Sequence, residues 1–180
     1  MESNHVQNEK QELNDLEIKN KINDIAENKK KDKFKLKGKI KKFDEKLYNK
    51  YDLPARLIMK EKLGDLIKDN SDIYAEDMIL EDEQCEYKYI ELQVCASWTN
   101  DKYPFNYPFV YERKGHFSDK TLFIIFDRHM TKGLIFGKNL LNSEPKRIQK
   151  YSRIFIYEVG WKNVLPFCTE NLDIDVLRSY

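Results

Sequence analysis

The stretch Tyr87–Trp98, YKYIELQVCASW, has the composition of a β-strand. Side chains on a strand point alternately to its two faces. One face is apolar and consists of Ile90, Leu92, Val94, Ala96 and Trp98. The other consists of Tyr89, Glu91, Gln93, Cys95 and Ser97. Glu91 and Gln93 therefore project together from a rigid element, and their oxygen atoms suit a hard divalent cation.

Length and composition predict one intracellular domain. The chain has 180 residues, of which 41% are hydrophobic and 13% aromatic, enough to bury a core. No apolar run approaches the length of a membrane span, and the N-terminus does not resemble a signal peptide. The three cysteines are widely spaced, which favours neither a disulfide framework nor a zinc site. We expect a location in the cytoplasm or nucleus, without secretion or membrane association.

The N-terminal quarter is a charged leader. Residues 1–28 carry seven acidic and three basic side chains, whereas residues 29–50 carry eleven lysines and three acidic residues. We expect residues 1–44 to be disordered and residues 45–180 to form the domain. The lysines could contact nucleic-acid phosphates, serve as an address for an import receptor, or be only solvated. The candidate nucleic-acid contacts are Lys29, Lys30, Lys31, Lys33, Lys35, Lys37, Lys39, Lys41 and Lys42.

The segment before the opening strand predicts a helix and a hairpin. Asp52 is a suitable N-cap for a helix that continues to about Ile67 and ends by residues 69–71. Tyr74–Leu80 has the composition of a strand, with Asp77 in its middle. A short acidic link joins it to the next strand, which predicts an antiparallel pair. Asp77 and Glu91 should then lie on neighbouring strands.

The C-terminal half supplies the rest of the sheet. The aromatic segment 99–117 should be a loop because of its prolines, covering a core edge or forming a platform for substrate. Thr121–Asp127 predicts a buried strand, and Gly133–Gly137 its return. A helix is expected from Ser143 to about Tyr151, followed by a strand over Arg153–Val159. The fold class is therefore α/β, with a mixed central sheet flanked by helices.

This order of elements resembles the PD-(D/E)XK, or restriction-endonuclease-like, nuclease superfamily over about Asp52–Gly137. Glu76-Asp77 occupies the position of the Pro-Asp motif, and Glu91-Leu92-Gln93 that of Glu-x-Lys, with glutamine in place of lysine. The resemblance implies that Asp77 and Glu91 bind Mg²⁺, with Mn²⁺ as the alternative. Glu61 would match the acidic residue that some members carry on the preceding helix.

The expected chemistry is phosphodiester hydrolysis. Two carboxylates on adjacent strands can hold Mg²⁺, and Gln93 can orient a water molecule although an amide is not a base. Lys114 is the candidate cationic helper. The favoured function is a Mg²⁺-dependent DNA endonuclease, with DNA favoured over RNA and a dimer as one possible assembly. The alternatives are a non-catalytic nucleic-acid-binding or protein-interaction domain on the same fold.

This hypothesis makes two structural predictions. The carboxylates of Asp77 and Glu91 should lie within about 6 Å of each other, which lets them share one cation. If their mutual repulsion dominates without metal, Glu91→Gln should be as stable as the parent or slightly more so.

Overall fold

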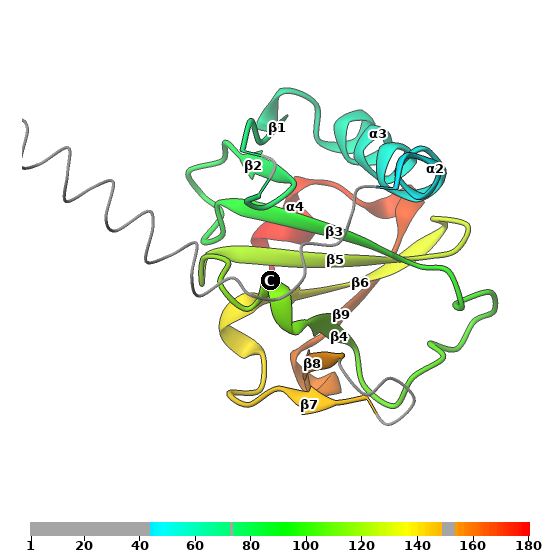
Figure 1. The fold of residues 1–180 in the computed structure, drawn as a ribbon. Coiled ribbons are helices and arrows are strands. Elements are labelled where there is room, and N and C mark those ends of the chain that lie inside the picture. The colour runs from blue at the N-terminus through cyan, green and yellow to red at the C-terminus, as the bar shows by residue number, and fades with distance from the viewer. Residues whose placement is uncertain (1–43, 73, 149–153) are drawn as a thin grey trace, which may run out of the picture. The chain divides into compact units, whose positions relative to one another are not determined.

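A six-stranded mixed sheet lies at the centre of the described part of this computed structural model, residues 44–72, 74–148 and 154–180. Its strand order is β1-β2-β3-β5-β6-β9, in which β3 and β5 are parallel and the other neighbours are antiparallel. The bounds are β1 Ile67–Asp69, β2 Met78–Leu80, β3 Tyr89–Cys95, β5 Thr121–Asp127, β6 Lys132–Gly137 and β9 Leu165–Cys168. The expected mixed sheet is therefore present (Figure 1).

The N-terminal helical segment begins earlier than the sequence predicted. Helix α2, a π-helical turn and helix α3 follow one another without a break, spanning Glu45–Leu47, Tyr48–Asp52 and Leu53–Leu63. The Asp44 carboxylate accepts the Leu47 N–H and caps the segment, whereas Asp52 has helical dihedral angles and makes no capping bond. The predicted cap at Asp52 is thus wrong, because the helix already continues through it. Helix α3 ends at Gly64, whose φ of 55° suits glycine.

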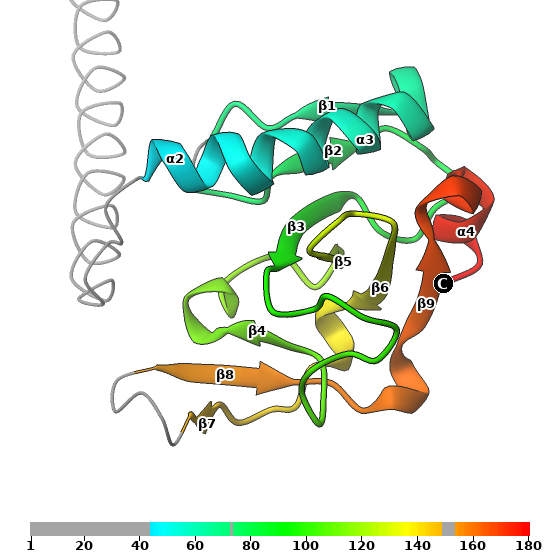
Figure 2. The same cartoon turned by 90° about the vertical axis from the view of Figure 1, so that its right-hand side faces the viewer.

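The helices cover one face of the sheet. Ala55, Met59 and Leu63 form the buried stripe of α3, and Leu177 is buried on α4, which spans Ile174–Arg178. They pack on the side chains of the central strands that point to this face, which include Ile90, Leu92, Leu122, Ile124, Phe126 and Ile135. Figure 2 shows α3 at the top of the view and α4 at the right, near the edge of the sheet that β9 forms.

A second, three-stranded sheet covers the opposite face, where helices were expected. Its order is β4-β8-β7, with bounds Phe109–Tyr111, Phe155–Glu158 and Lys146–Arg147 (Figure 2). The second core lies between the two sheets and comprises Cys95, Trp98, Tyr103, Val110, Phe123, Ile125, Leu134, Phe136 and Val159. The face of β3 that carries Glu91 is therefore covered by protein. The helix expected from Ser143 is also wrong, because Lys146–Arg147 pair with β8 instead.

The hairpin β5–β6 has the predicted position, and all seven residues of β5 are buried. Asp127 is buried at its turn and accepts the N–H groups of Thr131 at 2.7 Å and Lys132 at 3.1 Å. Short 3₁₀ segments join the other elements at Gly64–Leu66, Glu112–Lys114, Lys138–Leu140, Trp161–Asn163 and Thr169–Asn171. No helix among the described residues has the length and apolar character needed to cross a membrane.

Strands β2 and β3 are shorter than predicted, and the early end of β3 places the Trp98 side chain on the other face of the sheet. Strand β2 begins only at Met78, so that Asp77 immediately precedes it. Strand β3 ends at Cys95, where a turn closes with the Trp98 N–H donating to the Cys95 carbonyl at 2.9 Å. The turn places Trp98 in the same core as Cys95, whereas strict alternation assigned it to the opposite face.

Candidate functional site

Asp77 and Glu91 meet where β2 and β3 separate. The register pairs Met78 with Ile90, so Asp77 and Glu91 would form the next pair of the ladder. Side chains replace the ladder here: the Asp77 N–H donates to Glu91 Oε2 at 3.1 Å, and the Leu92 N–H donates to Asp77 Oδ2 at 2.9 Å. The carboxylates thus satisfy backbone donors that the end of the ladder would leave unpaired. These bonds confirm that Asp77 and Glu91 are neighbours, but Asp77 immediately precedes β2, whereas the sequence predicted it in the middle of a strand.

Each carboxylate also has a cationic partner. Lys114, the last residue of the 3₁₀ turn after β4, forms an ion pair with Glu91 Oε1, and both side chains are less than 10% exposed. Arg56 of α3 forms an ion pair with Asp77 Oδ1 and donates to the Asp77 carbonyl at 2.8 Å. The same guanidinium lies 3.1 Å from Asp69 Oδ1. We call Arg56, Asp77, Glu91 and Lys114 the charge network.

Burial controls the protonation of Glu91. It raises the pKa of Glu91 to about 7, with the charge of Asp77 acting in the same direction and Lys114 opposing it. Glu91 therefore changes its charge close to neutral pH. A cation that binds there must compete with a proton below pH 7.

The other predicted site residues differ in their positions. Gln93 lies on the same face of β3 as Glu91, and its Oε1 atom is buried without a hydrogen-bond partner among the described residues. Glu61 is exposed on α3, and among the described residues no hydrogen bond or ion pair joins it to the charge network. The nine lysines from Lys29 to Lys42 lie outside the described residues.

Sequence analysis did not identify two residues that help to form the site, Arg56 and Glu76. Arg56 has no local motif, and its partner Asp77 is 21 residues away along the chain. Glu76 is buried, and its Oε1 accepts the Ser118 N–H at 2.9 Å and the Thr121 hydroxyl at 2.7 Å. The sequence indicated a role for Glu76 only through its position next to Asp77. Glu76 holds the chain between Lys114 and β5 against the start of β2.

The donor atoms of this site fit a hard divalent cation. In the part of the chain that the structure describes, no three His, Cys, Asp or Glu side chains gather into a metal-binding group. Asp77 and Glu91 nevertheless provide four carboxylate oxygens, each of which accepts one donor and keeps a second lone pair. Gln93 Oε1, which has no hydrogen-bond partner in the described part of the chain, is a further neutral oxygen on the same face.

Comparisons with protein-family models, with curated proteins and with solved structures found no match to this chain.

Proposed function

We propose that this chain is a Mg²⁺-dependent phosphodiesterase that cleaves DNA. The observation that carries the proposal is the convergence of Asp77, Glu91 and Lys114 where β2 leaves β3. Asp77 immediately precedes β2 and Glu91 lies on the adjacent strand β3, whereas Lys114 is a cation brought from a distant segment. Such a combination supports chemistry in which negative charge develops on a phosphate group.

Asp77 and Glu91 would hold the metal ion through the lone pairs that their present partners leave free. Gln93 would add its amide oxygen or orient a water molecule. When bound, Mg²⁺ polarises the scissile phosphate and lowers the pKa of a coordinated water. The Asp77 side chain is 25% exposed and that of Glu91 only 8%, so solvent and substrate would approach from the side of Asp77.

Lys114 would have two roles. Its ammonium favours the ionised form of Glu91, which burial disfavours and cation binding requires. An ammonium group also has three N–H donors, and its ion pair with Glu91 leaves donors that can contact a phosphate oxygen. Lys114 thus supplies a cation in a site whose Glu-x-Gln motif has none.

One observation favours a second function, a nucleic-acid-binding domain without catalysis. Two cations neutralise the two carboxylates of the charge network, which is a satisfied arrangement without metal. In that case the network only links α3, β2, β3 and the turn after β4. Binding would then depend on basic surfaces alone.

Plasmid nicking and thermal unfolding separate the two functions. With Mg²⁺ or Mn²⁺, the wild-type chain should nick supercoiled plasmid and unfold at a higher temperature. Asp77→Asn should reduce nicking by about 10²-fold or more and remove the metal-dependent stabilisation. Glu83→Gln is the matched control, because Glu83 is exposed. If the wild type shows neither nicking nor stabilisation by either metal, the nuclease proposal is wrong and the binding function is favoured.

A further inference from the structure

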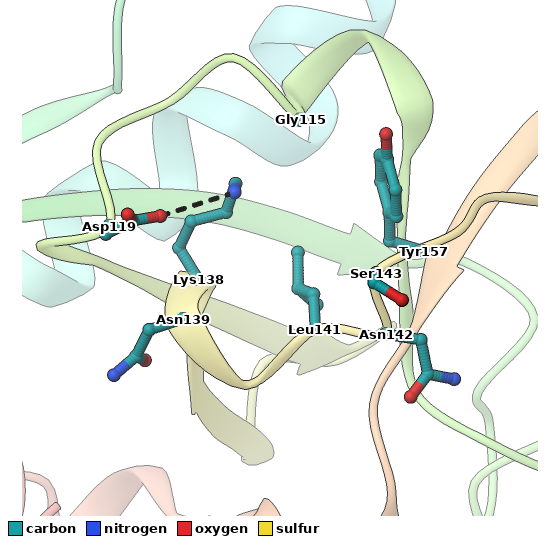
Figure 3. Close-up of a pocket in the computed structure, with 8 residues that line it drawn as sticks. All are labelled: Gly115, Asp119, Lys138, Asn139, Leu141, Asn142, Ser143 and Tyr157. Carbon is teal, nitrogen blue, oxygen red and sulfur yellow. Dashed lines mark ion pairs between the residues drawn. The ribbon is translucent and has the colours of Figure 1, made fainter.

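A polar pocket lies beside the segment that carries Lys114. It has a volume of about 390 Å³ and is lined by Gly115, Asp119, Lys138, Asn139, Leu141, Asn142, Ser143 and Tyr157. Lys138, Leu141 and Tyr157 point toward the turn at Gly115, whereas the side chains of Asn139 and Asn142 point away from it (Figure 3). The groups that face the pocket are thus the Lys138 ammonium with the Asp119 carboxylate beside it, the Tyr157 hydroxyl and the Leu141 side chain.

The geometry leaves both hydrogen-bond donors available to a ligand. Lys138 Nζ lies 3.6 Å from Asp119 Oδ1, which is longer than a hydrogen bond, and the Asp119 side chain is 82% exposed. Such an ion pair is weak, and Asp119 can turn away into water. Among the described residues, no hydrogen bond engages the Tyr157 hydroxyl. A Cβ added at Gly115 would lie 2.7 Å from the Tyr157 ring, so glycine is needed for this close packing.

The pocket is connected to the charge network through residues 114–119. Lys114 binds Glu91 and the Ser118 N–H donates to Glu76, while Gly115 and Asp119 line the pocket. One short segment therefore contacts both places. A ligand in the pocket would lie against the segment that positions Lys114.

We propose that this pocket binds a phosphate group of a nucleic-acid strand, with Lys138 and Tyr157 as donors. A phosphate accepts charge-assisted hydrogen bonds from an ammonium group and ordinary ones from a hydroxyl. The volume lies within the range of small-molecule sites and leaves room for the attached sugar. The choice of a strand over a free nucleotide rests on the proposed function. The pocket would hold a backbone phosphate near the one that is cleaved.

Binding measurements in EDTA test the pocket without requiring cleavage. The full chain is titrated with a fluorescein-labelled 12-nucleotide DNA, and separately with inorganic phosphate and a nucleoside monophosphate. Lys138→Gln should weaken binding of the DNA about tenfold and make its salt dependence shallower. Tyr157→Phe should weaken it by a few-fold. Lys162→Gln and Tyr111→Phe, which alter an exposed lysine and an exposed tyrosine, are matched controls and should change nothing.

Asp119→Asn gives a result that a merely structural role would not produce. The substitution removes the anion that competes for Lys138, so binding should become about two- to fivefold tighter. The leader lysines are the same in all variants, so differences between variants report on the pocket. The proposal is overturned if Lys138→Gln behaves like Lys162→Gln, if Asp119→Asn weakens binding, or if the wild type binds none of the probes. A nucleoside monophosphate that binds as tightly as the DNA would overturn the assignment to a strand.

The same variants distinguish failure of this inference from failure of the proposed function. If the chain binds DNA through Lys138 but nicks no plasmid, only the nuclease proposal is wrong. If the chain nicks plasmid and Lys138→Gln leaves KM unchanged, only the pocket assignment is wrong.

Discussion

The ion pair between Glu91 and Lys114 gives the sharpest test of the structure. Lys114→Met should lower the free energy of unfolding by about 3–5 kcal/mol at pH 8, because it leaves a buried carboxylate without its cation. At pH 5.5 the loss should be smaller. Burial has already raised the pKa of Glu91 to about 7, and removing Lys114 raises it further, so the variant takes up a proton instead of burying a charge.

Glu91→Gln should cost much less than Lys114→Met and leave the protein about as stable as the parent at pH 8. Burial raises the pKa of Glu91 to about 7, so a neutral side chain at this position avoids the cost of burying a carboxylate, and this gain offsets the ion pair lost from Lys114. The sequence predicted the same stability from the repulsion between two carboxylates. The double variant Glu91→Gln/Lys114→Met should lose only about 1–2 kcal/mol, because it buries no charge. The amide oxygen of glutamine at position 91 can still accept the Asp77 N–H. The remaining loss of stability comes from the amide N–H group, which has no acceptor in place of Lys114.

Urea unfolding of the four proteins at both pH values measures this cycle, with a coupling energy of at least about 2 kcal/mol expected at pH 8. The control cycle uses Lys68→Met and Glu81→Gln, an ion pair whose side chains are 54% and 47% exposed. Each control variant should cost less than about 1 kcal/mol, with no measurable coupling. Additive effects of the two substitutions, or a loss in Lys114→Met as small as that in Lys68→Met, would refute the buried pair.

Three further outcomes follow from the structure. The folded state holds an extra proton between the ordinary pKa of 4.5 and the raised value of about 7 at Glu91, so stability should fall as pH rises through this window. Urea unfolding from pH 4.5 to 8 should show a loss on the order of 3 kcal/mol relative to the Glu91→Gln/Lys114→Met double variant, and parallel curves would contradict it. Deleting residues 1–42 should leave the domain folded, since its first helix begins at Glu45 and is capped by Asp44; circular dichroism checks this, and a lost unfolding transition would show that the leader is part of the fold. Gly133→Ala should cost about 1–3 kcal/mol, because a Cβ would lie 2.5 Å from the Phe167 ring and 2.8 Å from the Ile125 carbonyl oxygen; an unchanged melting temperature would count against this packing.

Several features of the fold were predictable from local sequence. Alternation identified β3 and placed Glu91 and Gln93 on one face, and the buried run Thr121–Asp127 with its return identified the β5–β6 hairpin. The short link before β3 placed Asp77 beside Glu91. These features depend on neighbouring residues and short connections, whose geometry the chain determines locally.

Local patterns could not show where the helical segment starts or where strands stop. Asp44 and Asp52 are both acceptable caps, and only the packing of the continuous segment shows that the helix begins before Asp52. The end of β3 at Cys95 likewise turned Trp98 to the opposite face. A single turn is enough to reverse the alternation on which such an assignment depends.

The chemistry of the site was decided by tertiary structure. The sequence alone determined that a carboxylate and an amide share one face of β3, but not that this face is buried. Its cover depends on the pairing of β4 with β8, in which Phe109 lies opposite Glu158, a residue far from it in the sequence. That pairing and the turn after β4 bring Lys114 to Glu91, while α3 brings Arg56 to Asp77. Contacts between distant segments leave no periodic signal in the sequence, yet the burial they create sets the pKa of Glu91 and makes its ion pair with Lys114 a determinant of stability.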